Sequence, residues 1–437
     1  MAEDRLTIVF MPESAYGPTN NCVGIGKVLE RRGHRVVFAA EASWEGKLEP
    51  LGFEEDLVDL APPPPGDAAA DAEQDAGQFW IDFINETAPE FRKPTIEQLE
   101  TFIEPVFRSL IDGARYCEPQ LKAILDRAQP DVIVEDNVSV FPALLTHGAP
   151  FVRIMSCNPL EMKDPDLPPT FSGYPVDDRD GWDDYRAEYE RVHRPLWEET
   201  NAWVVDQGAP PLPDLEFIHE SRDLNLSVYP EIADYPRSRP LDGTWRRLDS
   251  SVRETEEAFE IPASLRDGDG SLVYLSLGSL GSADVELMKR LVEVLAETPH
   301  RYLVSKGPRA DEFDLPDNMW GEARVPQTSM IPLVDLVITH GGNNTTTEAF
   351  HFGKPMIVLP VFWDQYDNAQ RVHELGRGIR LETYAFGDDE LRSAVDRLLV
   401  DEPLRARMAR DGEEIRRRDG VTRAADLIEE LGRRRRS

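Results

Sequence analysis

The sequence predicts an α/β protein in which two open parallel sheets follow one another along the chain. Residues 6–11 form an apolar run, residues 23–32 have a helical period and residues 35–40 form a second apolar run, which together make a β-α-β unit. A separate alternating series begins at residue 271. The length of 437 residues also favours two domains, because a single hydrophobic core stops growing at about 250 to 300 residues.

In the first series, a turn-rich stretch from Ser14 to Asn21 follows the first strand, and Gly33 ends the first helix. The later elements repeat the alternation: a strand at 131–135, a helix at 141–146, a strand at 150–155 and a helix at 185–203. Turn residues are frequent at 229–250, so the domain boundary is expected there.

The second series alternates in the same way. Its strands are expected at 271–277, 301–305, 336–339 and 356–359. Its helices are expected at 285–296, 347–352, 364–374, 389–399 and 402–418. Open parallel sheets bind ligands where strands end and helices begin, so we expect the functional site in the cleft between the two sheets.

Two long irregular stretches, 61–76 and 164–184, interrupt the first series. Such insertions are either lids over a site or disordered linkers. The aromatic residues in and beside them either line an apolar pocket or belong to the core, and the core is the more frequent case. These aromatic residues are Phe79, Trp80, Phe83, Trp182, Trp197 and Trp203.

The chain is strongly acidic, with 82 Asp and Glu against 48 Lys and Arg and a formal net charge of −34. This charge repels nucleic acid, and the arginine run at 433–436 is more simply a solvated tail. The apolar stretches are strand-sized, which predicts no membrane span. Cys22, Cys117 and Cys157 lack the spacing of a zinc site or a disulfide framework, and the start of the chain lacks the basic region of a signal peptide. We therefore expect a cytoplasmic protein.

The most informative stretch runs from Asp335 to Gln365. A buried strand leads into Gly341 and Gly342, and a run of Asn and Thr then begins a helix. The N–H groups at this helix start, the helix dipole and the glycines form an anion site that a phosphate can approach closely.

Four side chains of this stretch suit a nucleotide. His340 would donate to a phosphate oxygen, and Asn344 and Thr345 supply further donors. Glu348 lies one turn into the helix, where it would accept from ribose hydroxyls. The alternative is that His340 is a buried capping residue and the Asn/Thr run only begins a helix.

This stretch resembles the C-terminal signature of the family 1 nucleotide-sugar glycosyltransferases, which include plant secondary-product enzymes and bacterial macrolide-type enzymes. The matching motifs occur in order at family-like spacing: Tyr274 to Ser279, Val325-Pro326-Gln327, His340 to Thr345 with Glu348, Pro360, and Asp364-Gln365. The resemblance covers roughly residues 270–375, and the whole chain at the level of the fold.

The resemblance implies the GT-B fold, in which two Rossmann-like parallel-sheet domains face each other across a cleft and a C-terminal helix crosses back to the first domain. The expected units are an acceptor-binding domain at 1–235, a linker at 236–265, a nucleotide-sugar-binding domain at 266–415, and a C-terminal helix and basic tail at 416–437.

The resemblance also implies roles on the donor side. His340 matches the α-phosphate ligand, beside Gly342 of the anion site, and Asn344 and Thr345 match the β-phosphate contacts. Glu348 matches the ribose contact. The remaining matches are Ser279 on the diphosphate side, Val325 and Gln327 at the nucleoside, and Asp364 and Gln365 at the sugar hydroxyls. Arg324 stands where plant members usually stack a tryptophan on the base, so the base preference stays open.

The acceptor side departs from the family pattern. Where the family generally has a glycine followed by a catalytic histidine, this chain has Gly17-Pro18. Asp136 matches the aspartate that orients this histidine, and we consider it the first candidate for a direct base, although a capping role is equally compatible with its position. Glu13 is the second candidate. Alternatively, the acceptor is an amine, thiol or acidic phenol that needs little help. His34, at a helix end, is interpreted as structural.

The expected function is inverting, metal-independent transfer of a hexose, with glucose as the first candidate, from a UDP- or dTDP-sugar. The acceptor would be a small apolar molecule such as a phenolic or polycyclic natural product, and no cofactor is expected. The main alternative is a catalytically silent homologue that lacks the usual catalytic histidine and either binds nucleotide sugars or acts as an auxiliary protein for a partner transferase. A sugar-nucleotide epimerase shares the architecture, whereas a nicotinamide enzyme is disfavoured because Gly24-Ile-Gly26 lies inside a helix.

Overall fold

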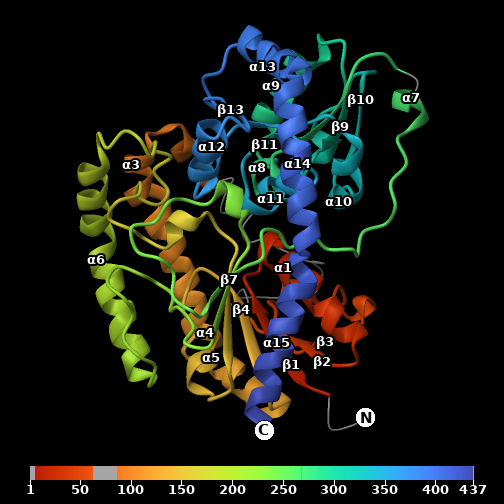
Figure 1. Cartoon of the computed structure of the whole chain (residues 1–437). Coiled ribbons are helices and arrows are strands. Elements are labelled where there is room, and N and C mark those ends of the chain that lie inside the picture. The colour runs from red at the N-terminus through yellow and green to blue at the C-terminus, as the bar shows by residue number, and fades with distance from the viewer. Residues whose placement is uncertain (1–4, 63–85, 267, 437) are drawn as a thin grey trace.

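The computed structural model describes residues 5–62, 86–266 and 268–436, and its two parallel sheets form two domains, one above the other (Figure 1). The first sheet has seven strands in the order β3-β2-β1-β4-β5-β6-β7. These strands are β1 (Thr7–Pro12), β2 (Arg35–Phe38), β3 (Glu54–Glu55), β4 (Val132–Asp136), β5 (Phe151–Met155), β6 (Leu224–Ser227) and β7 (Trp245–Arg247). The predicted α/β class is confirmed.

Both faces of the first sheet are buried, as the near-continuous apolar strands predict. Ile8 and Phe10 of β1 face one apolar cluster, and Val9 and Met11 face the other. The helices of this domain are α1 (Tyr16–Arg31), α3 (Thr95–Gln98), α4 (Glu104–Ala128), α5 (Pro142–Thr146) and α6 (Trp182–Asp206).

The second sheet has six strands in the order β10-β9-β8-β11-β12-β13. These strands are β8 (Leu272–Ser276), β9 (Arg301–Ser305), β10 (Met319–Glu322), β11 (Leu336–Thr339), β12 (Met356–Val358) and β13 (Gly378–Arg380). The accompanying helices are α7 (Ala263–Arg266), α8 (Gly278–Gly281), α9 (Val285–Ala296), α10 (Gln327–Met330), α11 (Asn343–His351), α12 (Gln365–Glu374), α13 (Asp388–Val400), α14 (Glu402–Arg418) and α15 (Gly420–Arg436).

Two sequence-based predictions about the first domain are corrected. The predicted loop at 14–21 is helical from Tyr16 onward, because Pro18 lies in the first turn, where a missing N–H costs nothing. The first domain also extends past its predicted end at residue 235. Its last strand, β7, is short and has the sequence Trp-Arg-Arg, so no apolar run in the sequence predicted a strand there.

The C-terminal helices cross from the second domain back to the first, as expected (Figure 1). Helix α14 packs on α11, and α15 packs on α1. The turn between them requires glycine at residue 420, because a Cβ there would lie 2.3 Å from the carbonyl oxygens of Leu248 and Ser250. His34 secures the far end: its Nδ1 accepts from the Leu6 N–H at 3.1 Å, and its Nε2 lies 2.8 Å from Glu429 Oε1 on α15.

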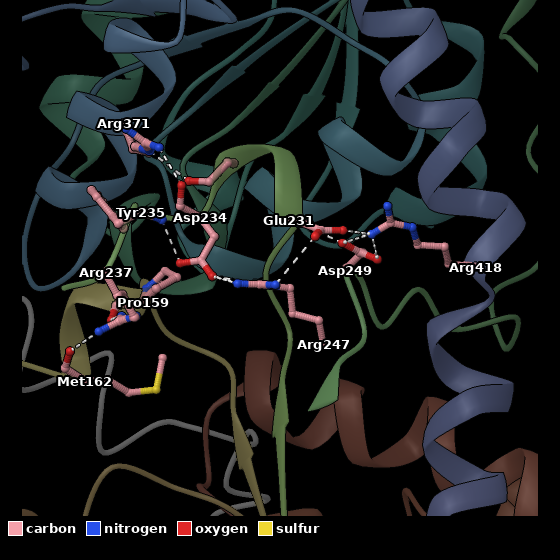
Figure 2. A network of polar contacts seen from close by, with 11 residues as sticks. Pro159, Met162, Glu231, Asp234, Tyr235, Arg237, Arg247, Asp249, Arg371 and Arg418 are labelled. Carbon is pink, nitrogen blue, oxygen red and sulfur yellow. Dashed lines mark hydrogen bonds and ion pairs between the residues drawn. The ribbon is translucent and has the colours of Figure 1, made fainter. Parts of the chain in front are cut away.

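A polar network connects α14 to the loops between the domains (Figure 2). Arg418 donates to Glu231 at 2.6 Å and to Asp249 at 3.0 Å. Arg247 then pairs with Asp234, whose carbonyl oxygen accepts from Arg371 of α12 at 2.5 Å. The network therefore binds the crossing helix, the last strand of the first sheet and the second domain to one another.

The insertion at 164–184 packs against the second domain. Asp367 of α12 accepts from the backbone N–H groups of Phe171 and Gly173 at 2.6 and 2.8 Å. Arg380 donates to the Gly173 carbonyl oxygen at 2.8 Å. The insertion is thus an ordered strap between the domains. Most of the other stretch, from residue 63 to 76, lies outside the described residues.

Within the described ranges, no helix has the length and apolarity that a membrane crossing requires.

We expect Glu429→Gln to loosen α15 and to lower the free energy of unfolding by about 1 to 3 kcal/mol at pH 7. Burial opposes the charge on Glu429, but hydrogen bonds from His34 and Arg32 bring its pKa below the usual range. An acid with a lowered pKa stabilises the fold above its unfolded pKa, so the loss should shrink below about pH 4.3. Urea denaturation at several pH values measures this.

The matched control is Glu430→Gln on the same helix. Glu430 pairs with Arg434 and its side chain is 55% exposed, so the change should cost less than about 0.5 kcal/mol. Equal effects of the two substitutions would contradict the role given to Glu429.

Candidate functional site

His340 directly follows β11, and its ring lies against two glycines at positions where a larger side chain would collide with it. A Cβ on Gly278 would lie 2.6 Å from the imidazole Cε1, and a Cβ on Gly342 would lie 2.4 Å from its Nε2. Gly278 also has a φ of +71°, which favours glycine. The loop that opens the second domain and the start of α11 therefore enclose the ring together. Ser279, the predicted diphosphate contact, follows Gly278 in the chain.

The imidazole of His340 is uncharged at neutral pH. Burial lowers its pKa to about 4. A neutral ring has one N–H donor and one acceptor nitrogen. The single N–H of His340 can go either to the Ser276 backbone, which the ring contacts, or to an anion at the N-terminus of α11, and the neutral ring supplies no positive charge there.

The predicted ribose and nucleoside contacts, Glu348 and Gln327, lie side by side. The Gln327 amide donates to Glu348 Oε2 at 2.5 Å and to Thr345 Oγ1 at 3.2 Å. The Gln327 carbonyl oxygen accepts from the Tyr274 hydroxyl at 2.9 Å. The other Glu348 oxygen accepts from Arg253 at 3.1 Å. Arg253 belongs to the linker and had no motif that singled it out in the sequence.

Asn344 connects the donor side to the first domain. Its amide nitrogen donates to the Gly17 carbonyl oxygen at 2.9 Å, and its amide oxygen accepts from Asn21 at 3.3 Å. Asn21 also donates to Asp136 Oδ2 at 3.2 Å. One side chain of α1 therefore joins the predicted phosphate contact to the candidate base. The sequence contained no signal for this role, because Asn21 lies in the turn-rich stretch that the sequence predicts to be a loop.

Asp136 ends β4 and is buried. Burial raises its pKa to about 8, although hydrogen bonds from Ser156 at 2.6 Å and from Asn21 favour its charged form. Glu13 lies nearby, because its backbone N–H donates to the Asp136 carbonyl oxygen at 2.8 Å. The Glu13 carboxylate accepts from the Ala15 N–H at 2.9 Å and thus faces the start of α1.

Asp364 and Gln365, the predicted sugar contacts, begin α12. The Asp364 carboxylate accepts from the Asn158 N–H at 2.8 Å, and burial raises its pKa to about 7. Gln365 accepts through its side-chain oxygen from the N–H groups of Val361 and Phe362 at 3.0 and 3.2 Å. Because Ser156 contacts Asp136 and Asn158 contacts Asp364, three consecutive residues of one loop join the two carboxylates.

Val325 and Arg324 are the remaining positions on the predicted nucleoside side. Val325 packs against the core of the second domain. The guanidinium carbon of Arg324, at the position of the plant tryptophan, lies 5.1 Å from the centre of the Tyr16 ring. Arg324 thus stacks on the first domain, and this contact forms another link across the cleft.

An aromatic cavity lies beside Asp364. Its aromatic walls are Phe107, Phe171, Tyr189, Phe217 and Trp363, and its polar lining includes Glu161, Lys163, Thr170 and Glu216. The rings of Trp363 and Phe171 are 4.4 Å apart. The strap therefore covers this cavity, which favours the lid interpretation.

The aromatic residues singled out in the sequence do not line this cavity. Trp182 is buried at the start of α6, Trp197 donates to the Pro213 carbonyl oxygen, and Trp203 stacks under Arg115. Phe79, Trp80 and Phe83 lie outside the described residues. The pocket was missed because its walls come from five separate segments that the tertiary fold assembles.

Comparisons with known proteins find glycosyltransferases among the relatives of this chain. The family model described as "Erythromycin biosynthesis protein CIII-like, C-terminal domain" matches residues 286–431. The chain is 23% identical to the "NDP-glycosyltransferase YjiC" of Bacillus subtilis, covering 98% of this chain and 97% of that protein. It is 25% identical to the "Oleandomycin glycosyltransferase" of Streptomyces antibioticus, covering 95% and 88%. It is also 26% identical to the "Sterol 3-beta-glucosyltransferase" of Eremothecium gossypii, but spans only 20% of that protein's length.

Two solved structures share the fold. The glycosyltransferase of kitacinnamycin has a TM-score of 0.68 at 22% identity, covering 98% of this chain and 99% of the other. The glycosyltransferase VinC, solved in complex with dTDP, has a TM-score of 0.66 at 20% identity, covering 98% and 100%. At these identities the likeness concerns the fold, which is GT-B as expected.

We expect Gly278→Ala to displace the His340 ring and to lower the free energy of unfolding by about 1 to 3 kcal/mol, because the new Cβ meets the imidazole in a left-handed backbone conformation. Thermal and urea denaturation measure this cost. The control is Gly243→Ala, whose Cβ would have no atom within 4 Å. A cost for Gly278→Ala no larger than that of the control would show that the ring does not depend on the glycine.

Proposed function

We propose that the chain is a family 1 nucleotide-sugar glycosyltransferase and that it transfers a hexose from a UDP- or dTDP-sugar to a small apolar acceptor; the matches to the family model and to the two bacterial glycosyltransferases support this. Glucose is the first candidate for the sugar, and the transfer inverts the anomeric carbon without a metal ion. One observation supports this proposal above the others: Asn21 joins Asn344, at the anion site of α11, to the buried carboxylate of Asp136. Donor-side and acceptor-side groups are thus in one hydrogen-bonded unit.

The donor site suits departure of a nucleoside diphosphate. As the glycosidic bond breaks, the sugar gains positive character and the diphosphate gains negative charge. Fixed N–H groups at the start of α11 and the N–H of His340 would stabilise that charge more in the transition state than in the ground state. Asp364 would accept from sugar hydroxyls and disfavour sugars that leave it unpaired. VinC was solved with dTDP, which supports the dTDP-sugar as the donor.

Asp136 is the first candidate for the base. A general base works best when its pKa lies near the working pH, and a pKa of about 8 meets this condition. Ser156 and Asn21 hold its two oxygens and would orient it in place of the absent histidine. Glu13 ranks second, because its carboxylate is engaged at the start of α1.

We propose a small apolar acceptor, such as a phenolic or polycyclic molecule; the aromatic cavity has a volume of only about 20 Å³, enough for one water molecule, so its walls would have to move apart to admit such an acceptor. Aromatic walls favour stacking on a planar ring system. Trp363 lines this cavity and is followed directly by Asp364, which places the cavity next to the proposed sugar site. We also propose a cytoplasmic location, because Cys22, Cys117 and Cys157 are unpaired, as is usual in a reducing compartment.

The first test is donor turnover. The protein is incubated with UDP-glucose or dTDP-glucose and a panel of phenols, amines and thiols, and nucleotide release and new glycosides are followed by mass spectrometry. We expect glycosides, and roughly tenfold or more weaker donor binding for His340→Ala but not for the exposed His373→Ala. Donor binding without transfer would favour the silent homologue, and an epimerised free donor would favour the epimerase.

The second test concerns the base. Since Asp136 must be ionised to accept a proton and its pKa is raised to about 8, kcat/KM should rise with pH and level off above about pH 8. Asp136→Asn should lower kcat by roughly 100- to 10,000-fold with donor affinity unchanged, whereas Glu13→Gln should retain most activity. A larger loss for Glu13→Gln than for Asp136→Asn would indicate that Glu13 is the base. A small loss for both would indicate an acceptor that needs no base.

A further inference from the structure

None of the predicted phosphate, ribose and sugar contacts of the donor site carries a positive charge. Its donors are backbone N–H groups, amides, hydroxyls and the imidazole of His340, which burial keeps neutral at pH 7. Its ionisable members Glu348 and Asp364 are acids, and the whole chain has a net charge of −34. A nucleoside diphosphate brings further negative charge into this field. A cation beside the site would therefore strengthen binding and stabilise the leaving group.

The linker places Arg253 at this site. The segment from Ser251 to Glu256 lies between α1 and the second domain. Ser251 donates to the Asn21 carbonyl oxygen at 3.4 Å, and Glu256 accepts from the Thr328 N–H at 2.6 Å. A Cβ on Gly24 would lie 3.5 Å from the Arg253 Cα, so the backbone of the linker lies directly on α1.

The guanidinium of Arg253 is largely buried, with a side-chain exposure of 10%, and it pairs with both Glu348 and Glu256. Glu348 and Asn344 are four residues apart on α11 and so share one face, about 6 Å apart along the axis. Asn344 therefore lies about one helical turn from the carboxylate that Arg253 contacts. The planar fork of N–H donors on Arg253 also matches two phosphate oxygens, which a lysine cannot do.

A ribose that hydrogen-bonds to Glu348 competes with Arg253 for the same carboxylate. Glu348 Oε1 accepts from Arg253 and Oε2 accepts from Gln327, so both oxygens are engaged. When ribose hydroxyls donate to this carboxylate, the guanidinium loses part of its pairing. The nearest new anion is then the diphosphate at the start of the same helix.

We propose that Arg253 is a donor-binding residue: it pairs with Glu348, yields that carboxylate to the donor's ribose, and contacts the donor's diphosphate. This inference rests on the proposed function. In this proposal, the linker between the two domains supplies the positive charge at the diphosphate. The motifs of the second domain supply none there.

The test measures dissociation constants of UDP, dTDP and the free nucleosides by isothermal titration calorimetry. Arg253→Gln should weaken UDP or dTDP binding by roughly tenfold or more and leave nucleoside binding nearly unchanged. It should also reduce the salt dependence of nucleotide binding, because a charge contact is lost. Arg253→Lys should recover part of the affinity.

A second pair of variants separates this role from simple neutralisation of Glu348. Arg253→Gln by itself leaves the buried Glu348 carboxylate unpaired. The substitution is therefore also made in the Glu348→Gln variant, which lacks this carboxylate, and the double variant is compared with Glu348→Gln alone. If Arg253 contacts the diphosphate, the double variant binds UDP more weakly than Glu348→Gln alone. If the two bind UDP equally, Arg253 only neutralises Glu348 and the proposal is wrong.

Arg246→Gln is the control for loss of one positive charge, because Arg246 donates to the carbonyl oxygens of Gly243 and Trp245 away from the site. Thermal denaturation verifies that each variant is folded. Tighter binding of both nucleotide and nucleoside by Arg253→Gln would show that Arg253 only keeps Glu348 from the ligand, and it would overturn the proposal. If the unaltered protein bound neither UDP nor dTDP, the proposed function itself would fail, which is a distinguishable outcome.

Discussion

Buried polar groups of each domain find their hydrogen-bond partners on the other domain, and this requirement determines how the two sheets face each other. Asp364 and Asp367 of the second domain accept from backbone N–H groups of the first. Asn344 accepts from and donates to α1. A buried polar group without a partner costs about 1 to 3 kcal/mol, so a shift of one domain against the other would be costly at several places at once.

The same contacts shape the chemistry of the site. Burial between the domains raises the pKa of Asp136 to about 8 and that of Asp364 to about 7. These carboxylates lie on opposite sides of the loop from Ser156 to Asn158, which contacts both. The packing around these groups therefore also sets the basicity of Asp136, the proposed base.

Three arginines connect separate segments of the chain in this arrangement. Arg418 joins the crossing helix to the loops below it, Arg371 donates to the carbonyl oxygens of Ala233 and Asp234, and Arg253 reaches Glu348 from the linker. A guanidinium remains charged when buried and offers several donors in one plane. In a chain with so many carboxylates, these arginines connect segments that come from different parts of the sequence.

The sequence by itself determined the alternation of strands and helices, the two-sheet class and the residues around His340, because these depend on periodicity and turn chemistry within about ten residues. It could not reveal short edge strands such as β7 and β10, whose pairing depends on a neighbouring strand rather than on an apolar run. Nor could it reveal Asn21 or Arg253, whose partners Asn344 and Glu348 are distant in the chain. Only the tertiary structure decided these, because a polar side chain acquires its role from whichever segment the fold places beside it.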